Sequence, residues 1–395
     1  MTRRTALVLL VVAAAIGTTT AAATRDSAHT VSLRLSDRTV RFGADLAASG
    51  RIAPALEGAE IVLEQRRDRN WMAVRTTRTD PGGSFSVRFA PLRAGPLRAR
   101  LADEGAVSAA ADVGVRPVVR LEPRVGRAFL GARLDVRVRP RSSAAGVRAT
   151  VRKRGHRVAT VAGRLTRGRA RLEIPTPGVG RFGVRVELAA AHGLDRVSKT
   201  TRVRANVRTL AYRSTGRDVR ALVERLAELR VRTPPATRMF GAEVIDAVLA
   251  FQKLRGLPRD GVVNVDMWRE LARATVPRPR YSGRRPHIEV DKTRQILMVV
   301  KGGAVRTVVS ASTGATGNTP EGTFTIRWKA PWTTTWLGPA ILYRTMTFYG
   351  DNFAIHGYPE VPAYPASHGC VRIPMWVADW LYRRSPVGER VYVYS

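Results

Sequence analysis

The spacing of apolar residues changes twice along the chain. From Thr30 to Pro117, and again from Val118 to Asn206, apolar and polar residues alternate in short runs. Turn residues such as Asp80-Pro-Gly-Gly separate these runs. Alternation with a period of two predicts half-buried β-strands joined by turns. We therefore expect two consecutive all-β domains, at residues 24–117 and 118–206.

A helical period replaces the alternation near Gly216. Apolar residues recur every three or four positions in two stretches, the second ending at Gly256 and Pro258. The positions that show this spacing are Val219, Leu222, Val223, Leu226 and Leu229, followed by Val244, Val248, Phe251 and Leu254. A short third helix should hold Trp268. Residues 207–275 are thus predicted to form a three-helix domain, and a domain this small needs Phe251 and Trp268 inside its core.

Alternation returns in the last part of the chain. A Pro- and Arg-rich linker at residues 276–285 precedes it. Strands are expected around Ile288, at Gln295–Val300 and Val305–Val309, at Phe324–Trp328 and at Asn352–His356. A helix at Trp376–Arg384 should precede a closing strand. The fold class is therefore multidomain and mostly β: two β-sandwich domains, a three-helix domain and a mixed, mostly β C-terminal domain at 286–395.

The first 23 residues have the pattern of an export signal. Arg3 and Arg4 precede an apolar run from Ala6 to Ile16, and small residues follow up to Ala23. The run is shorter than the roughly 20 residues that span a membrane. We expect cleavage after Ala23, with retention as an N-terminal anchor as the alternative. The remaining chain should be exported, without a stable membrane span after cleavage.

The net charge is strongly positive. The chain has 67 Lys and Arg against 31 Asp and Glu, which gives a formal charge of +36. Such a charge favours polyanions, but export argues against nucleic acid as the partner. Outside the membrane the available polyanions are wall polymers and anionic lipid head groups, which remain as candidate partners. Because the arginines are spread over the whole chain, most are expected on solvated strand faces.

The chain's one cysteine lies in a segment that contains several reactive residue types. Cys370 follows Ser367-His368-Gly369, and a second histidine, His356, lies in Ile355-His356-Gly357. A thiol attacks as its thiolate, so it needs a base or an imidazolium nearby. Gly369 lets a substrate approach closely and should leave backbone N–H groups free for an oxyanion. The structural alternative is that Cys370 is a small buried apolar residue.

Arg372 completes the segment, two residues after Cys370, and its guanidinium suits a bidentate bond to a substrate carboxylate. One free thiol beside a His-Gly pair in an exported protein risks oxidation, which favours a nucleophilic role for Cys370.

Three parts of the chain resemble known families. The two β domains resemble bacterial immunoglobulin-like sandwiches in architecture alone. The helical part resembles the small peptidoglycan-binding domain of exported wall enzymes, through Asp218 to Leu222, Phe240-Gly241, Ala250-Phe251-Gln252, Gly256 to Gly261 and Trp268. It departs from that pattern before Phe240, where the usual glycine and aspartate are missing. Residues 286–395 resemble the L,D-transpeptidase catalytic domain, through Thr319 to Phe324, Tyr343 to Phe348, His356-Gly357 and Ser367 to Arg372.

The last resemblance implies acyl transfer between peptidoglycan stem peptides. Cys370 would attack a donor tetrapeptide and form a thioester, which an acceptor amine resolves. The family gives the base role to the position of His356, although the residues by themselves leave His356 and His368 both open. His368 and Ser367 would then support the nucleophile loop.

The resemblance also assigns substrate contacts and leaves some points open. Arg372, Tyr349 and Gly350 lie where the family contacts the donor. Tyr358 stands where relatives carry a small hydroxyl residue, so the partner of the His356 ring would be a backbone carbonyl. No metal or cofactor is expected.

Other functions use the same residues. Water as acceptor would give an L,D-carboxypeptidase, and a lysine of another protein would give an anchoring transpeptidase. A catalytically idle wall-binding scaffold is the alternative outside enzymes. The partners in each case are peptidoglycan stem peptides and glycan.

Overall fold

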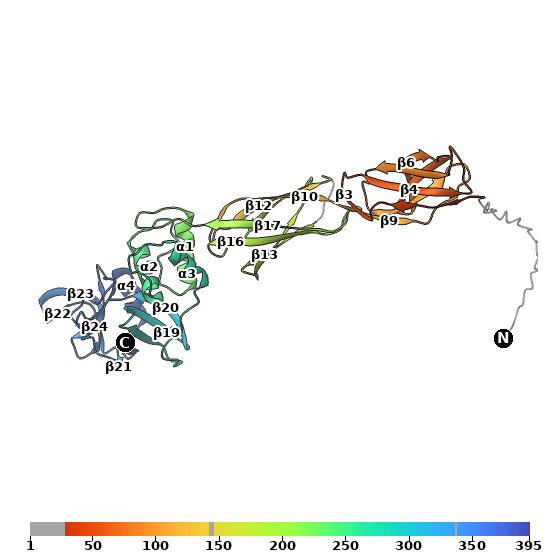
Figure 1. Cartoon of the computed structure of the whole chain (residues 1–395). Coiled ribbons are helices and arrows are strands. Elements are labelled where there is room, and N and C mark those ends of the chain that lie inside the picture. Colours follow the sequence, from red (N-terminus) through yellow and green to blue (C-terminus); the bar gives the residue numbers. More distant parts are fainter. Residues whose placement is uncertain (1–27, 142–145, 336–337) are drawn as a thin grey trace, which may run out of the picture. The chain divides into compact units, whose positions relative to one another are not determined.

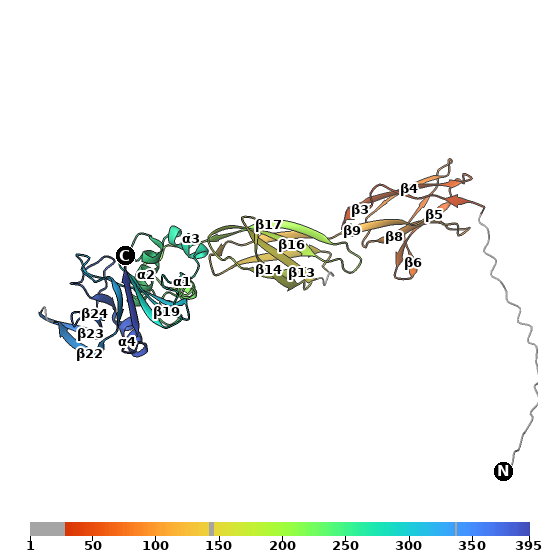
Figure 2. The same cartoon turned by 90° about the horizontal axis from the view of Figure 1, so that it is seen from below.

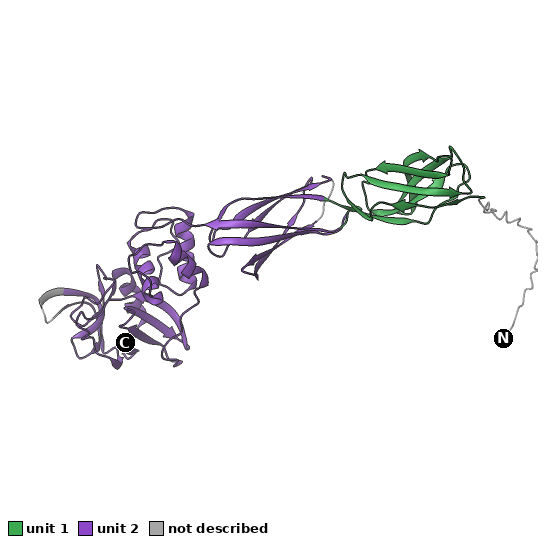
Figure 3. Ribbon diagram, in the orientation of Figure 1, with its two compact units in different colours: residues 1–117, 192–195 green, residues 118–191, 196–395 purple. Residues whose placement is uncertain are grey.

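The structure, a computed structural model, describes residues 28–141, 146–335 and 338–395. The predicted export signal at residues 1–23 lies outside them. The chain divides into two compact units, as Figure 3 shows. The first runs up to Pro117 and includes His192–Asp195, and the second comprises Val118–Ala191 and Arg196–Ser395. Among the described residues, no helix is both long and apolar enough to cross a membrane.

The first unit is a sandwich of two sheets, labelled in Figures 1 and 2. In one sheet β4 lies between β1 and β2 and also pairs with β7, and the other has the order β3-β9-β8-β5-β6. Its strands are β1 (Thr30–Val31), β2 (Arg34–Leu35), β3 (Thr39–Arg41), β4 (Leu46–Ala53), β5 (Glu60–Arg67), β6 (Asn70–Arg78), β7 (Ser84–Phe89), β8 (Gly95–Leu101) and β9 (Ala111–Arg116). The Asp80–Gly83 turn forms as predicted, but it links strands of different sheets instead of closing a hairpin.

The second unit begins with another two-sheet sandwich. A three-stranded sheet has the order β10-β12-β15, and a five-stranded sheet has the order β11-β17-β16-β13-β14. The strands are β10 (Val118–Pro123), β11 (Gly126–Arg127), β12 (Ala132–Arg139), β13 (Gly146–Lys153), β14 (His156–Arg164), β15 (Arg169–Ile174), β16 (Gly180–Leu188) and β17 (Val197–Asn206). The inward residues of the alternating runs, among them Leu134, Val184 and Phe182, form its core.

Three helices follow: α1 (Arg217–Glu228), α2 (Ala242–Arg255) and α3 (Val265–Arg273). Helix α2 ends at Gly256, which adopts the left-handed conformation that glycine accepts without a Cβ clash. The side chain of Asn264 caps α3 by accepting from two backbone N–H groups. Phe251 and Trp268 are buried in the core of these helices, as expected.

The C-terminal domain holds two sheets and one helix. One sheet has the order β20-β19-β18-β26-β21 and the other β22-β23-β24-β25. The elements are β18 (His287–Asp291), β19 (Ile296–Lys301), β20 (Ala304–Ser310), β21 (Gly322–Thr325), β22 (Trp328–Thr335), β23 (Gly338–Tyr349), β24 (Phe353–Tyr358), β25 (Val371–Pro374), α4 (Met375–Arg384) and β26 (Arg390–Tyr394).

The expected strand at Phe324–Trp328 is in fact the end of β21 and the start of β22. The two strands belong to different sheets, so the chain must leave one sheet before it enters the other. The long hairpin of β22 and β23 was not predicted. It places β23 between β22 and β24, and β24 contains His356.

Candidate active site

Two parallel strands bring the histidine and the cysteine segments together. Ile355 of β24 pairs with Val371 of β25, and His356 pairs with Arg372. Residues two apart in an extended strand share a face. The side of β25 that carries Arg372, and Cys370 just before it, therefore lies beside His356. Figure 1 shows β24 within this part of the chain.

The ring of His356 is buried and fixed by its own backbone. Its Nδ1 lies 3.0 Å from the carbonyl oxygen of Gly357. A carbonyl can only accept, so Nδ1 carries the proton and Nε2 is left as the basic nitrogen. This is the backbone partner that the sequence had suggested in place of a hydroxyl side chain. Burial lowers the pKa of His356 to about 4, the nearby Arg372 charge adds to this, and the Gly357 bond opposes it.

The thiol of Cys370 is also held in its neutral form. Burial raises its pKa above the ordinary value, while a backbone hydrogen bond from Ala354 and the charge of Arg372 act in the opposite direction. The Sγ atom lies 3.5 Å from the carbonyl oxygen of Asn352, to which the thiol donates. At neutral pH the site therefore holds a thiol and a neutral imidazole, which can act as a base, rather than a thiolate–imidazolium pair.

Ser367 closes the loop that carries the thiol. Its hydroxyl donates to the carbonyl of Cys370 at 2.6 Å and accepts from the N–H of Gly369 at 3.0 Å. The Gly369 amide is therefore occupied, so this N–H is not one of the backbone groups left free for an oxyanion. Gly369 has a φ of +132°, and a Cβ there would lie 2.6 Å from a ring carbon of Phe353. Only glycine fits this position without moving Phe353.

Two residues that the sequence analysis gave no role hold the same loop from the other side. The amide of Asn318 donates to the carbonyl of His368 at 2.9 Å, and the hydroxyl of Thr319 donates to the carbonyl of Gly369 at 2.7 Å. These contacts join residues 50 positions apart. In the sequence, Thr319 belongs to the Thr319 to Phe324 motif. That motif indicated a resemblance to a family, but it did not predict a contact with the nucleophile loop.

The remaining candidates lie around the thiol. The ring of Tyr349, half exposed at the end of β23, lies 5.7 Å from the ring of Phe353, and Gly350 follows in the turn that leads to Asn352. The side chain of His368 is exposed. These residues border the site, but no hydrogen bond joins their side chains to Cys370 within the described ranges.

Arg372, the candidate clamp for a substrate carboxylate, already has partners within the chain. Its guanidinium lies over the ring of Tyr358, 4.1 Å from the centroid, and one nitrogen donates to the carbonyl of Ala366. Its Nε is buried and has no partner among the described residues. Tyr358, which departs from the family pattern, thus supports Arg372 by a cation–π contact.

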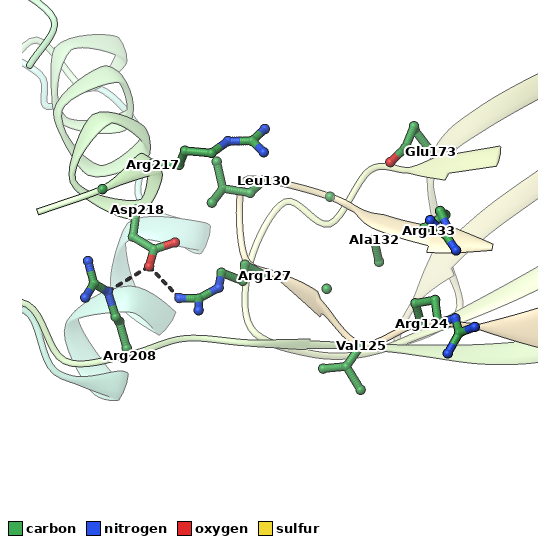
Figure 4. Close-up of a pocket in the computed structure, with 13 residues that line it drawn as sticks. Arg124, Val125, Arg127, Leu130, Ala132, Arg133, Glu173, Arg208, Arg217 and Asp218 are labelled. Atoms are coloured by element: carbon green, nitrogen blue, oxygen red, sulfur yellow. Dashed lines mark hydrogen bonds and ion pairs between the residues drawn. The ribbon is translucent and has the colours of Figure 1, made fainter. Parts of the chain in front are cut away.

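A second feature of the same unit is a cavity of about 700 Å³ where the second sandwich meets the helices. Figure 4 shows Asp218 between Arg127 and Arg208, and the ion pairs are 2.6 and 2.8 Å long. Arginines outnumber acidic residues in its wall, which contains Arg124, Arg127, Arg133, Arg208 and Arg217 against Glu173 and Asp218. We call it the arginine-lined cavity.

Comparisons with known proteins agree with this architecture. Residues 285–393 match the model of the L,D-transpeptidase catalytic domain, and residues 215–271 match a putative peptidoglycan binding domain. No curated protein matched the chain.

Three solved structures resemble parts of the chain. An L,D-transpeptidase from Xylanimonas cellulosilytica is 33% identical, over 48% of this chain and 98% of that one, with a TM-score of 0.46. One from Stackebrandtia nassauensis is 24% identical, over 46% and 92%, with a TM-score of 0.30. One from Mycobacterium smegmatis is 13% identical, over 71% and 99%, with a TM-score of 0.26.

The fold and the site thus define a multidomain protein with a cysteine-containing C-terminal domain next to a peptidoglycan-binding domain. Residues 285–393 of the chain belong to the L,D-transpeptidase catalytic domain family.

Proposed function

We propose that this protein is an exported, cysteine-dependent L,D-transpeptidase that forms peptidoglycan cross-links in the cell wall. The observation that carries the proposal is the pairing of His356 with Arg372 on parallel strands, next to the chain's one thiol. An orienting bond on Nδ1 leaves Nε2 of His356 as a base for that thiol. An idle scaffold would not need this arrangement.

The proposed reaction has two halves. In the first, Nε2 of His356 takes the thiol proton while the sulfur attacks the carbonyl carbon of the third residue of a donor tetrapeptide. The C–N bond to the terminal D-alanine then breaks, and the proton passes to the leaving amine. This leaves a thioester on Cys370.

In the second half, a side-chain amine of an acceptor stem attacks the thioester. His356 removes a proton from that amine and returns it to the departing sulfur. Tyr349, Gly350 and Arg372 are proposed to contact the donor, and His368, Ser367 and Gly369 to hold the loop. Arg372 would have to leave the Ala366 carbonyl to bind a carboxylate with two bonds.

Mass spectrometry of purified muropeptides incubated with the protein tests this function. Cross-linked dimers that have lost one alanine are expected with the wild type and absent with Cys370→Ala, which changes little volume. Tripeptides alone would indicate an L,D-carboxypeptidase, and a stem peptide on a protein lysine would indicate an anchoring enzyme. If the folded wild-type protein makes no product, the remaining interpretation is a catalytically idle wall-binding scaffold.

We further propose that the arginine-lined cavity binds anionic wall polymers. Its charge balance supports this, because clustered cations raise the local concentration of anions and salt screens the attraction. Arg217→Glu should weaken binding of the full chain to phosphate-rich wall fragments at low salt. The matched control is Arg148→Glu, an exposed arginine on β13 with the same charge change. Equal losses for both variants would show that net charge, and not the cavity, is responsible.

A further inference from the structure

A buried lysine joins the peptidoglycan-binding domain to the catalytic domain. Lys253, in the last turn of α2, is 1% exposed. Its Nζ lies 2.8 Å from Ser310 Oγ, 2.8 Å from the Ala311 carbonyl and 3.1 Å from the Pro362 carbonyl. An ammonium has three N–H donors, so all three are used, and every acceptor belongs to the other domain.

The acceptors lie at the start of two segments that run side by side toward the thiol. Ser312 donates from its hydroxyl to the Tyr364 carbonyl at 2.7 Å. The N–H groups of Ala366 and Ser367 both donate to the Thr313 carbonyl, at 2.9 and 3.0 Å. Lys253 thus clamps residues 310–311 to Pro362, and the clamped pair leads directly into the loop of Ser367 and Cys370.

Other contacts of the same domain reach the same region or the neighbouring elements. Arg259 donates to the Ala363 carbonyl at 2.9 Å. Val231 pairs with Val308 at the edge of β20, and Trp376 of α4 donates to Asp246 at 2.9 Å. Two contacts fall on the segment that precedes the nucleophile: the Lys253 bond to Pro362 and the Arg259 bond to Ala363.

An apolar residue would join two domains at lower cost. Burying an ammonium without a carboxylate is costly, and the three hydrogen-bond acceptors of Lys253 among the described residues are all neutral oxygens. Burial lowers the pKa of Lys253 to about 7, with Arg259 adding to the shift and Asp246 opposing it. What an apolar side chain cannot do is fix two backbone carbonyls at once.

We propose that Lys253 is a positioning residue: through it, α2 of the peptidoglycan-binding domain sets the 361–367 segment that aims Cys370. The helical domain is then a structural part of the active site and not only a tethered binding module. The inference rests on the proposed function in that Cys370 is taken as the nucleophile.

The test compares full-chain Lys253→Met with a matched control, Lys329→Met. Lys329 is only partly buried, but it too donates to two backbone carbonyls, those of Tyr382 and Ser385 at the end of α4. For each variant we would measure the melting temperature, the hydrogen exchange of the Ala366 and Ser367 amides, the iodoacetamide rate of Cys370 against pH, and kcat and KM for a tetrapeptide donor.

Lys253→Met should expose the Ala366 and Ser367 amides to faster exchange and move the thiol pKa down toward that of a free cysteine. The kcat should fall about ten- to a hundred-fold, the usual effect of a misplaced reacting group, with KM changed little. Lys329→Met should lower the melting temperature without these local effects. Arg259→Met, which removes the contact to Ala363 at a less buried position, should act in the same direction more weakly even where Lys253→Met fails to fold.

The result that overturns the inference is unchanged exchange and alkylation in Lys253→Met or, if that variant does not fold, in Arg259→Met. The same result in Lys253→Met and Lys329→Met would also overturn it, because the lysine would then only stabilise the fold. If the wild type makes no muropeptide product, the proposed function fails, but exchange and alkylation still decide the role of Lys253.

Discussion

Replacing His356 by alanine separates two ways in which a histidine can activate a thiol. A histidine that is charged at rest lowers the pKa of the cysteine, whereas a neutral one acts only when the proton moves. The structure favours the second, because burial lowers the pKa of His356 to about 4 and raises that of Cys370. His356→Ala should therefore not raise the thiol pKa, and the space left by the ring should let it fall toward about 8.5.

The same variant should slow acylation strongly. General acid–base catalysis contributes about a hundred- to ten-thousand-fold, which is about 3–5 kcal/mol of barrier. Iodoacetamide rates against pH give the thiol pKa, and single-turnover acylation by a tetrapeptide donor gives the rate. His368→Ala is the matched control, since that ring is exposed and its removal should leave the alkylation profile as in the wild type.

Two results would refute this reasoning. A wild-type thiol pKa below about 7 would mean that the resting pair is charged. Acylation reduced by His368→Ala but not by His356→Ala would make His368 the base.

Three further changes test the site and its surroundings. Gly369→Ala should lower both the melting temperature and the acylation rate, because its Cβ would meet the Phe353 ring at 2.6 Å; a variant with wild-type kinetics would contradict this. His356 has a pKa of about 4 in the folded state and about 6.5 in the unfolded state. The free energy of unfolding of the wild type, relative to that of His356→Gln, should therefore fall by about 3 kcal/mol as the pH drops from about 6.5 to 4. Denaturant titrations at several pH values measure this difference. Asp246, which accepts a hydrogen bond from Trp376, should show the opposite pH dependence, because burial raises its folded pKa to about 6. The wild type should lose stability relative to Asp246→Asn as the pH rises from about 4 to 6. A stability difference that does not change with pH would show that the carboxyl is not buried in solution.

The sequence by itself determined most of the elements and the residues proposed to carry the chemistry. Local periodicity is a property of neighbouring residues, so the period of two predicted the two all-β domains and the helical spacing predicted the three helices. The break at Gly256 ended α2 for a local steric reason. The His-Gly and Ser-His-Gly-Cys motifs named His356 and Cys370 as candidate site residues without any knowledge of their distance.

The tertiary structure decided how these elements meet. The parallel pairing of β24 with β25 brings the His356 and Cys370 segments together, and burial is the main cause of the pKa shifts that keep both groups neutral. The Asn318 and Thr319 bonds to the nucleophile loop, like the Lys253 clamp between two domains, join residues far apart in sequence. Desolvation and long-range hydrogen bonds depend on which segments pack together, and no local pattern of residues encodes that choice.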